Sequence, residues 1–547
     1  MAKNSLLCAL FLVVFVGFAS AQDFSYGYLV EFTDKQNTIY STERPLEFLS
    51  QRAIDRRQKH SIEITEQDFP VNKTYTDSLL KYNSILHSTS RWFNSAVFYT
   101  HSNGFITDAQ SCSFVKKITL VYRGESFKTA ANKNKWQSLS EWELYGSSYN
   151  QISMCNAHKL HEMGYRGNGL HIAVLDAGFW RADEFAGFDS LFQNNRILST
   201  WDFVLNHTNV FDDDSHGMSV LSTMGGNIPG ELIGTAPEAS YHLFRTENVD
   251  NEFPIEEENW IAGAEVADSA GADIITASLG YSTYDDDSMS HSYADMDGKT
   301  TRITKGAELA FSKGIFVVNS AGNEGAASWK YITAPSDGEN VLCIGAVNAD
   351  KTITEFSSHG PSFDGRVKPD VVAKGGNTTL IKNDGSVGTG SGTSFSGPVM
   401  AGMVACFWQA LPDYSNKQIL DLVRSYGNRY SNPDSTYGFG IPDFGKSPFL
   451  INSFDVTQKS NAEMVKVYPN PFNEILSLHF YQKKGQEVEL ALFDVLGNEV
   501  YSEKRQVNPE SYNLIELKGL SKFEQGYYIV SLYTDDGILS KKVMRVN

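Results

Sequence analysis

Cysteine, proline and long apolar runs are scarce in this chain of 547 residues, which has five cysteines and 16 prolines. Four of the cysteines lie far apart and form no C-x-x-C pair, so a zinc site of that type is excluded. They allow three disulfide pairings, and free buried thiols are the alternative: Cys112, Cys155, Cys343 and Cys406. Beyond the start of the chain no segment is apolar over the roughly 20 residues that a membrane span needs, so we expect no transmembrane segment.

Positive charge is also in short supply. Lysine and arginine number 46 against 65 aspartates and glutamates, which makes a formal net charge of -19. This balance argues against nucleic acid or an anionic lipid surface as the principal partner, because both attract basic proteins. Apolar residues make up 41% and charged residues 20% of the chain, which is typical of a globular protein. At roughly 150 residues per domain, the length predicts three or four units.

The first 21 residues have the pattern of an export signal. Lys3 precedes a largely apolar stretch, 6–18, and Ala19, Ser20 and Ala21 form a small-residue cleavage site. We expect cleavage after Ala21 and export of the remainder. Cys8 raises the alternative of a lipoprotein anchor, but it lies early in the apolar stretch and the cleavage site follows it.

The rest of the chain divides into sections that differ in composition and hydrophobic pattern. Residues 22–130 mix strand-like runs such as YGYLVEF and SAVFYTH with a charged helical stretch, which predicts a small α+β domain. Residues 131–150 lack an apolar period and predict an exposed connector. Residues 463–547 alternate polar and apolar positions between Asn- and Gly-containing turns, which predicts a compact all-β sandwich.

Residues 151–452 carry short, continuous apolar strands that alternate with helices: HIAVLDAG, ASYHLFR, ADIITASLG, GIFVVNSAG, NVLCIGAV and KPDVVAKG. Continuous apolar strands are buried on both faces, and their alternation with helices favours parallel β-α-β construction. We therefore predict an α/β domain with a doubly wound, mainly parallel sheet. Reactive groups should gather at the carboxyl ends of its strands.

Four polar residues stand at strand ends or helix starts of this domain. Asp176 ends the strand in VLDAG, His216 begins an apolar helical pattern in SHGMSV, and Asn323 follows a strand in SAGNEG. Ser394 lies among glycines in GSGTSFSG, at the start of an apolar helix. Each has an ordinary structural role available, in a turn or a helix cap. A hydroxyl at a helix N-terminus can also act as a nucleophile, since the local amides stabilise an oxyanion.

In this order the four motifs resemble those of the subtilases, the subtilisin-like serine peptidases, and SLG, FSSHGP, KPDVVA and YGFGIPD resemble secondary landmarks of that family. The resemblance implies acyl transfer: Ser394 as nucleophile, His216 as general base and acid, and Asp176 as the residue that orients His216. It implies that Asn323 holds the oxyanion. It also implies that Ser278, Leu279 and Gly280 line the cleft and pair the substrate as an added strand.

The sequence departs from the family at three positions. Ala177 and Met218 stand where a hydroxyl residue commonly follows the aspartate and His-Gly, and Phe395-Ser396 replaces the frequent Met-Ala. None of these changes removes a reacting group. They are therefore expected to affect the reaction rate more than the mechanism. No cofactor is required for the implied chemistry. The acidic runs 212–214, 256–258 and 285–287 lack a recognisable calcium-loop spacing, which favours a solvated charged face; structural calcium, which many subtilases bind, is the alternative.

The flanking sections have family resemblances of their own. The 22–130 domain occupies the place of a subtilase propeptide, with cleavage expected within 131–150; a retained accessory domain is the alternative. The C-terminal section resembles the type IX secretion sorting domain of Bacteroidetes through YPNPF, DVLGNEV and GYYIVSLYTDDG. This implies contact with the type IX machinery and location outside the cell or on its outer surface, reached through the periplasm. A structural or carbohydrate-binding β-sandwich is the alternative.

The resulting hypothesis is a secreted serine endopeptidase, made as a preproprotein, that acts on proteins or peptides as a monomer. Two other classes remain as alternatives. A non-catalytic binding protein on a subtilase scaffold has no need to keep all four polar residues. An esterase with the same triad lacks its usual G-x-S-x-G motif here, because the sequence around Ser394 is GTSFS.

Overall fold

The computed structural model describes residues 26–102, 104–123, 145–446, 466–468, 470–482, 486–494, 498–508, 511–534 and 537–546. They fall into two compact units, Met1–Gly445 and Lys446–Asn547. The expected export signal, 1–21, and most of the expected connector, 131–144, lie outside the described residues. Within the described end of that connector, Tyr145 and Ser148 are buried, so it is not exposed at these two positions.

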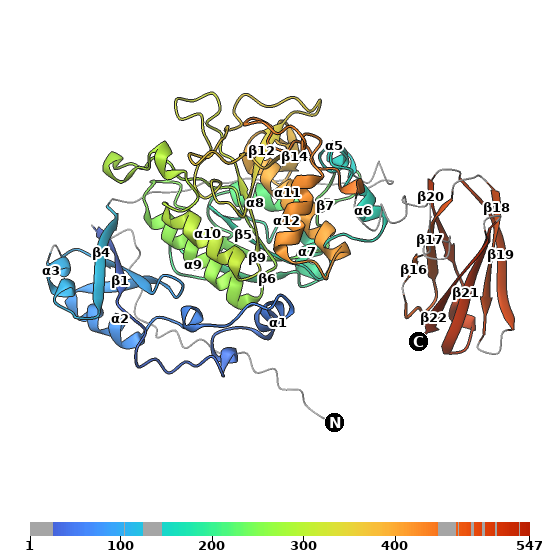
Figure 1. Cartoon of the computed structure of the whole chain (residues 1–547), viewed down its shortest axis with the longest axis horizontal. Helices are drawn as coiled ribbons and strands as arrows, with labels where there is room; N and C mark the ends of the chain where they lie inside the picture. The colour runs from blue at the N-terminus through green and yellow to red at the C-terminus, as the bar shows by residue number, and fades with distance from the viewer. Residues whose placement is uncertain are drawn as a thin grey trace. The chain divides into compact units, whose positions relative to one another are not determined.

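A seven-stranded parallel sheet forms the centre of the first unit, with the order β13-β12-β11-β10-β5-β9-β6 (Figure 1). Its strands are β5 (His171–Asp176), β6 (Ile197–Asp202), β9 (Ser240–Arg245), β10 (Ile274–Ala277), β11 (Phe316–Ser320), β12 (Val341–Val347) and β13 (Val371–Lys374). Strands β10 to β13 are buried throughout, as continuous apolar strands covered on both faces require. The predicted fold class is confirmed.

Two pairs of helices pack on this sheet. Helix α8 (His216–Gly225) packs with α11 (Thr393–Ala410), and α9 (Ile255–Ala270) packs with α10 (Arg302–Ser312). Smaller elements complete the domain: α5 (Tyr149–Ser153), α6 (His158–Glu162), α7 (Asp189–Gln193), α12 (Asn416–Ser425) and the strand pairs β7 (Asn227–Ile228) with β8 (Leu232–Ile233) and β14 (Thr378–Ile381) with β15 (Val387–Gly390). Edge strand β6, ILSTWD, was not predicted, because its half-exposed polar positions interrupt the apolar run.

The N-terminal domain is α+β, as predicted. Its antiparallel sheet has the order β2-β3-β1-β4. The elements are β1 (Tyr26–Phe32), α1 (Gln51–Lys59), α2 (Lys73–Leu79), β2 (Ser84–Ser90), β3 (Ser95–Thr100), α3 (Phe105–Gln110) and β4 (Val115–Tyr122). Helices α2 and α3 contribute to the apolar core of this domain, whereas α1 contacts α9 of the central domain. Strand β2, SILHSTS, was not predicted because it is mostly polar.

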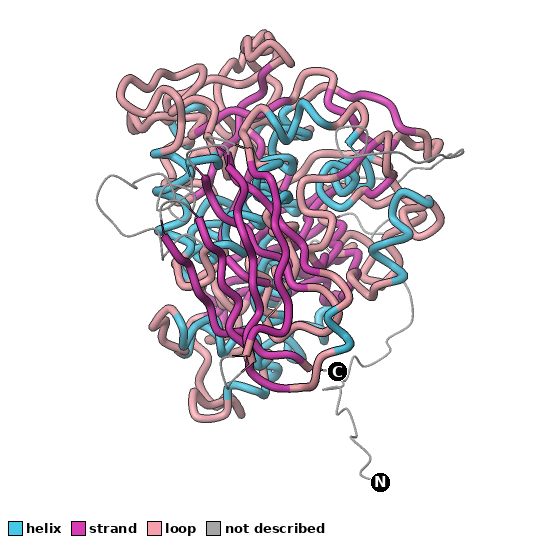
Figure 2. Tube along the Cα trace, turned by 90° about the vertical axis from the view of Figure 1, so that its right-hand side faces the viewer, coloured by secondary structure: helices cyan, strands magenta, loops and turns pink. Residues whose placement is uncertain are grey.

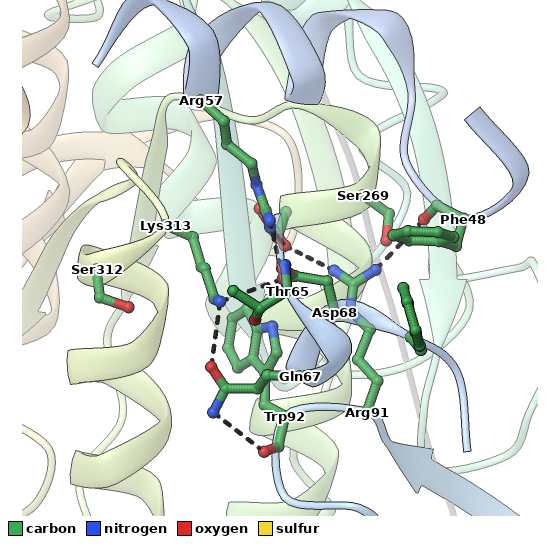
Figure 3. A network of polar contacts seen from close by, with 12 residues as sticks. Phe48, Arg57, Thr65, Gln67, Asp68, Arg91, Trp92, Ser269, Ser312 and Lys313 are labelled. Carbon is green, nitrogen blue, oxygen red and sulfur yellow. Dashed lines mark hydrogen bonds and ion pairs between the residues drawn. The ribbon is translucent and has the colours of Figure 1, made fainter. Parts of the chain in front are cut away.

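A buried, charged contact joins this domain to α9 and α10 of the central domain (Figure 3). The Asp268 carboxylate on α9 accepts from Arg56, from Arg57 at 2.6 Å and from Arg91 at 2.7 Å. Lys313, after α10, lies 3.2 Å from the buried Asp68. An apolar cluster adds to the contact, with Phe253 and Ile255 beside Leu29, Val97, Tyr99, Val121 and Tyr122.

The second unit is all-β, as predicted (Figure 2). One antiparallel sheet has the order β16-β17-β20 and the other β19-β18-β21-β22. The strands are β16 (Lys466–Tyr468), β17 (Leu476–Gln482), β18 (Gln486–Phe493), β19 (Glu499–Val507), β20 (Ser511–Leu517), β21 (Gly526–Thr534) and β22 (Gly537–Arg545). Their inward side chains form one apolar core that includes Phe480, Leu490 and Leu532.

Two expectations about the whole chain can be compared with the described residues. The cysteines among them are free thiols, of which Cys155, Cys343 and Cys406 are buried and Cys112 is half-buried. The alternative of disulfide pairing is therefore not realised there. In the described part of the chain, no helix combines the length and the apolar character that crossing a membrane requires.

Candidate active site

The carboxyl end of β5 and the start of α8 bring Asp176 and His216 together. Asp176 is fully buried, and its Oδ1 lies 2.6 Å from Nδ1 of the imidazole. The opposite side of His216 faces outward, with 33% of the side chain exposed. The backbone N–H of His216 donates to Asp214 Oδ1 at 2.7 Å, which satisfies the first free N–H of α8. The hydrogen bond at Nδ1 orients the imidazole ring, so that Nε2 lies on the exposed side of the ring.

The charges around His216 favour its protonated form. Burial alone would lower the pKa of the imidazole, but the negative charge of Asp176, the hydrogen bond between the two and the charge of Asp214 together raise it above the usual 6.5. Asp176 thus does two things at once, since it orients the ring and stabilises the imidazolium that forms when the ring accepts a proton.

The backbone around Ser394 presents free hydrogen-bond donors. Ser394 is the second residue of α11, so its N–H has no acceptor within the helix. Asn323, just beyond β11, accepts through Oδ1 from the Thr393 N–H at 2.9 Å and from the Thr393 hydroxyl at 3.0 Å. A backbone N–H can only donate, so this contact identifies the oxygen of the Asn323 amide and leaves Nδ2 as a donor.

Gly392 leaves room beside these donors. A Cβ at this position would lie 3.6 Å from the Ser394 nitrogen and 3.8 Å from Asn323 Nδ2. The volume that a side chain would fill is therefore open, and both donors border it. An anionic oxygen placed there would be stabilised by two N–H groups at the positive end of α11.

The segment 278–280 follows β10 and is tied to the same place. Ser278 is buried and donates its hydroxyl to the carbonyl of Ser394 at 2.8 Å. Leu279 is half-buried and Gly280 exposed, so this stretch of backbone borders the site. The ring of His216 lies 6.1 Å from the ring of Phe395, centroid to centroid.

The structure thus gathers all the predicted residues at the carboxyl ends of β5, β10 and β11. Within the described residues the Ser394 hydroxyl makes no hydrogen bond with the His216 ring. One oxygen of Asp176, Oδ2, also finds no donor in the described part of the chain, whereas Oδ1 accepts from the Ala177 N–H at 2.8 Å. The orphaned oxygen accords with the absence of hydroxyl groups at positions 177 and 218.

Sequence reasoning missed three supporting residues. Thr393 anchors Asn323, and Ser320 donates to the Thr393 carbonyl at 2.7 Å, which holds the start of α11 on β11. Asp214 accepts from the first free N–H of α8. All three are hydroxyl or carboxylate residues one or two positions from a predicted site or strand end, and that proximity was the available signal.

Most carboxylates of the expected calcium runs have partners within the protein. Asp213 pairs with Arg245 at 2.7 Å, Glu257 with His291 at 2.6 Å, Glu258 with Arg302, and Asp286 with the Ser288 hydroxyl at 2.6 Å. A different set could hold a cation: Glu247, Glu252 and Glu256 each bring one carboxylate oxygen within 4.8 Å of the others. Burial, and then the neighbouring Asp285, raise the pKa of Glu252 to about 7. Structural calcium stays a prediction.

This arrangement defines a class of protein, the serine hydrolases. A buried aspartate is hydrogen-bonded to a histidine, and a serine lies at a helix N-terminus at the same carboxyl edge of a parallel sheet. Comparison with known families makes this more specific. A model of the subtilase family matches residues 167–440, half of the chain. The chain belongs to this family and is a subtilisin-like serine peptidase.

Individual relatives agree with this family. Serine protease AprX of Bacillus subtilis is 29% identical over 304 residues, which cover 50% of this chain and 65% of that protein. Subtilisin E of Bacillus subtilis is 29% identical over 293 residues, covering 53% of this chain and 68% of the relative. Subtilisin of Bacillus pumilus has the same identity, with 94% of its length covered.

Both flanking domains match family models as well. Residues 27–138 match the peptidase S8 propeptide domain of Bacteroidota, and residues 466–546 match a secretion system C-terminal sorting domain. The protein is therefore a peptidase with a propeptide and a type IX sorting domain. The sorting domain indicates secretion or display on the outer cell surface.

Proposed function

We propose that the protein is a secreted endopeptidase that hydrolyses peptide bonds of proteins or peptides through an acyl-enzyme on Ser394. The observation that carries this proposal is the buried Asp176 held 2.6 Å from His216 Nδ1, at the sheet edge where the start of α11 presents Ser394. This arrangement prepares His216 as a base whose charged form is already stabilised.

In the first half of the reaction, the Ser394 hydroxyl attacks the substrate carbonyl and His216 Nε2 takes its proton. The C–O bond to Ser394 forms while the carbonyl π electrons move to oxygen. That oxyanion occupies the space beside Gly392 and accepts from the Ser394 N–H and Asn323 Nδ2. His216 then donates its proton to the leaving amine, and the peptide C–N bond breaks.

In the second half, water attacks the acyl-enzyme. His216 removes a proton from the water and returns it to Ser394 as the ester bond breaks, which regenerates the enzyme. Asp176 orients His216 and stabilises its imidazolium form in both halves. The chemistry uses the chain's own groups, so we propose no metal or organic cofactor for it and leave calcium to a structural role.

The propeptide and the sorting domain lead us to propose that the protein becomes active only after export and processing. We propose that residues up to a point within 131–150 are removed before full activity, and that the type IX machinery recognises the C-terminal domain. The mature enzyme then works outside the cell as a monomer, where unfolded or folded proteins are its substrates.

A fluorophosphonate probe tests the assignment, because it reacts covalently with an activated serine nucleophile. The secreted protein and its Ser394→Ala variant are treated in parallel, the labelled peptide is mapped, and the mature N-terminus is sequenced. We expect label on Ser394, none in the variant, and an N-terminus between 131 and 155. A folded, processed protein that takes no label would overturn the peptidase mechanism and favour the binding-protein alternative.

A further inference from the structure

Thr333 lies buried between two glycine-containing segments that border the reaction centre. Only 3% of the residue is exposed, and its hydroxyl oxygen is shielded from water without a hydrogen-bond partner among the described residues. A Cβ added to Gly280 would overlap Thr333 Oγ1, and one added to Gly322 would lie 3.2 Å from the same atom. The Thr333 side chain therefore fills the space between the two glycines.

The two glycines belong to opposite borders of the proposed cleft. Gly280 ends the segment 278–280, whose Ser278 is bonded to the Ser394 carbonyl, and Gly322 directly precedes Asn323. A substrate carbonyl held between the Ser394 N–H and Asn323 Nδ2 places its own residue, P1, beside both segments. The Thr333 side chain, packed against both glycines, then limits the room for a P1 side chain that enters between the two segments.

Hydrogen bonds keep the gap between the two segments from widening. Tyr281 and Ala334 exchange backbone hydrogen bonds of 2.9 and 3.1 Å, which tie the first segment to the chain that carries Thr333. On the other side, the Ser358 N–H donates to the Gly322 carbonyl at 3.0 Å, and the Ser358 hydroxyl accepts from the Glu324 N–H at 3.0 Å.

We propose that Thr333 makes the P1 pocket shallow, so that the enzyme cleaves after small residues such as alanine and serine and not after aromatic residues. This inference rests on the proposed function and adds its substrate class. Its physical basis is steric: the Thr333 hydroxyl oxygen is already out of reach of a water molecule, so a larger side chain has no volume to occupy without moving two bonded segments.

The test compares peptide p-nitroanilides that differ only at P1, with alanine, leucine or phenylalanine, as substrates of the processed secreted enzyme. We expect kcat/KM for alanine to exceed that for phenylalanine by about 10-fold or more, since one or two misplaced methylene groups already change kcat/KM by such factors. Thr333→Gly should raise kcat/KM for phenylalanine about 10-fold or more and change that for alanine by less than about 3-fold.

Thr333→Val is the matched control, because it keeps the branched shape and removes only the hydroxyl. We expect it to retain the preference for alanine; loss of that preference would overturn the steric proposal. Fluorophosphonate titration counts competent active sites in every variant, and if Thr333→Gly does not fold, the wild-type profile and Thr333→Val decide the matter.

Equal or better cleavage after phenylalanine by the wild-type enzyme would overturn the shallow pocket and leave the peptidase mechanism intact. The absence both of fluorophosphonate label and of cleavage in all three peptides would instead refute the proposed function, and this inference with it.

Discussion

Replacing Asp268 with asparagine tests how strongly the propeptide is held on α9. The Asp268 carboxylate has no exposed surface and accepts from three propeptide guanidinium groups, those of Arg56, Arg57 and Arg91. Asparagine keeps the size of the side chain but removes its charge and half of its acceptor capacity. Three buried positive charges would then share one fewer negative charge.

The expected loss follows from that geometry. Removal of one partner from a buried ion pair costs about 3–5 kcal/mol, because the remaining charge stays desolvated. Separation of the two domains should become easier by the same amount, which corresponds to a factor of about 10² to 10³ or more in the opening equilibrium. The backbone amides of Arg91 and Trp92 report this opening directly, since both donate to Glu265 of α9, at 2.8 and 3.1 Å.

Amide hydrogen exchange measures the effect in the full precursor with Ser394→Ala, which prevents self-cleavage. We expect exchange at the two amides to accelerate by about 10²-fold or more in Asp268→Asn. The control is Asp77→Asn, whose aspartate is half exposed and pairs with Lys73 on the propeptide surface, a contact worth at most about 1 kcal/mol. Equal exchange in the two variants would refute the idea that Asp268 holds the domains together.

Three further predictions concern the peptidase domain. Gly392→Ala fills the space between the two proposed oxyanion donors, so kcat should fall by about 10²-fold; unchanged kcat would remove that space from the mechanism. Burial lowers the pKa of His216, but the charges of Asp176 and Asp214 raise it above 6.5, so kcat/KM should decline as the pH falls through that raised value. Asp214→Asn should move this acidic limb to lower pH, and an unmoved limb would contradict the electrostatic account. Burial raises the pKa of Glu252 from 4.5 to about 7, so it contributes stability that is complete below pH 4.5 and lost as the pH rises through 7. The melting temperature should accordingly drop between pH 5 and pH 8, less steeply in Glu252→Gln, and identical slopes would show that Glu252 stays ionised.

Much of the fold followed from local patterns. The apolar strands of the central sheet were predictable because strands buried on both faces form continuous apolar runs. HIAVLD and VLCIGAV, for example, form β5 and β12. Strands β2 and β6 escaped prediction because their stability comes from partners distant in sequence. Ser199 of β6, for example, shares a hydrogen bond of 2.8 Å with His242 of β9, 43 residues further along the chain, which no pattern within the strand indicates.

The site divides in the same way. Asp176, His216 and Ser394 could be named beforehand because each stands at the end of a strand or the start of a helix and because their motifs, in this order, resemble those of the subtilases. The anchoring of Asn323 by Thr393 could not, since 70 residues separate them. The buried network around Asp268 joins residues more than 170 positions apart, and nothing in PLEFLSQRAIDRRQKH shows which carboxylate its arginines will meet.

The sequence by itself determined the periods of the apolar residues, and with them the α/β centre, the two flanking domains and the chemical types at each strand end. Periodicity is a local property, which the chain carries before it folds. Tertiary structure alone decided which oxygen of Asp176 meets His216, which atom of the Asn323 amide meets Thr393, and that Thr333 packs between Gly280 and Gly322. Those are distances between segments far apart along the chain, and only packing sets them.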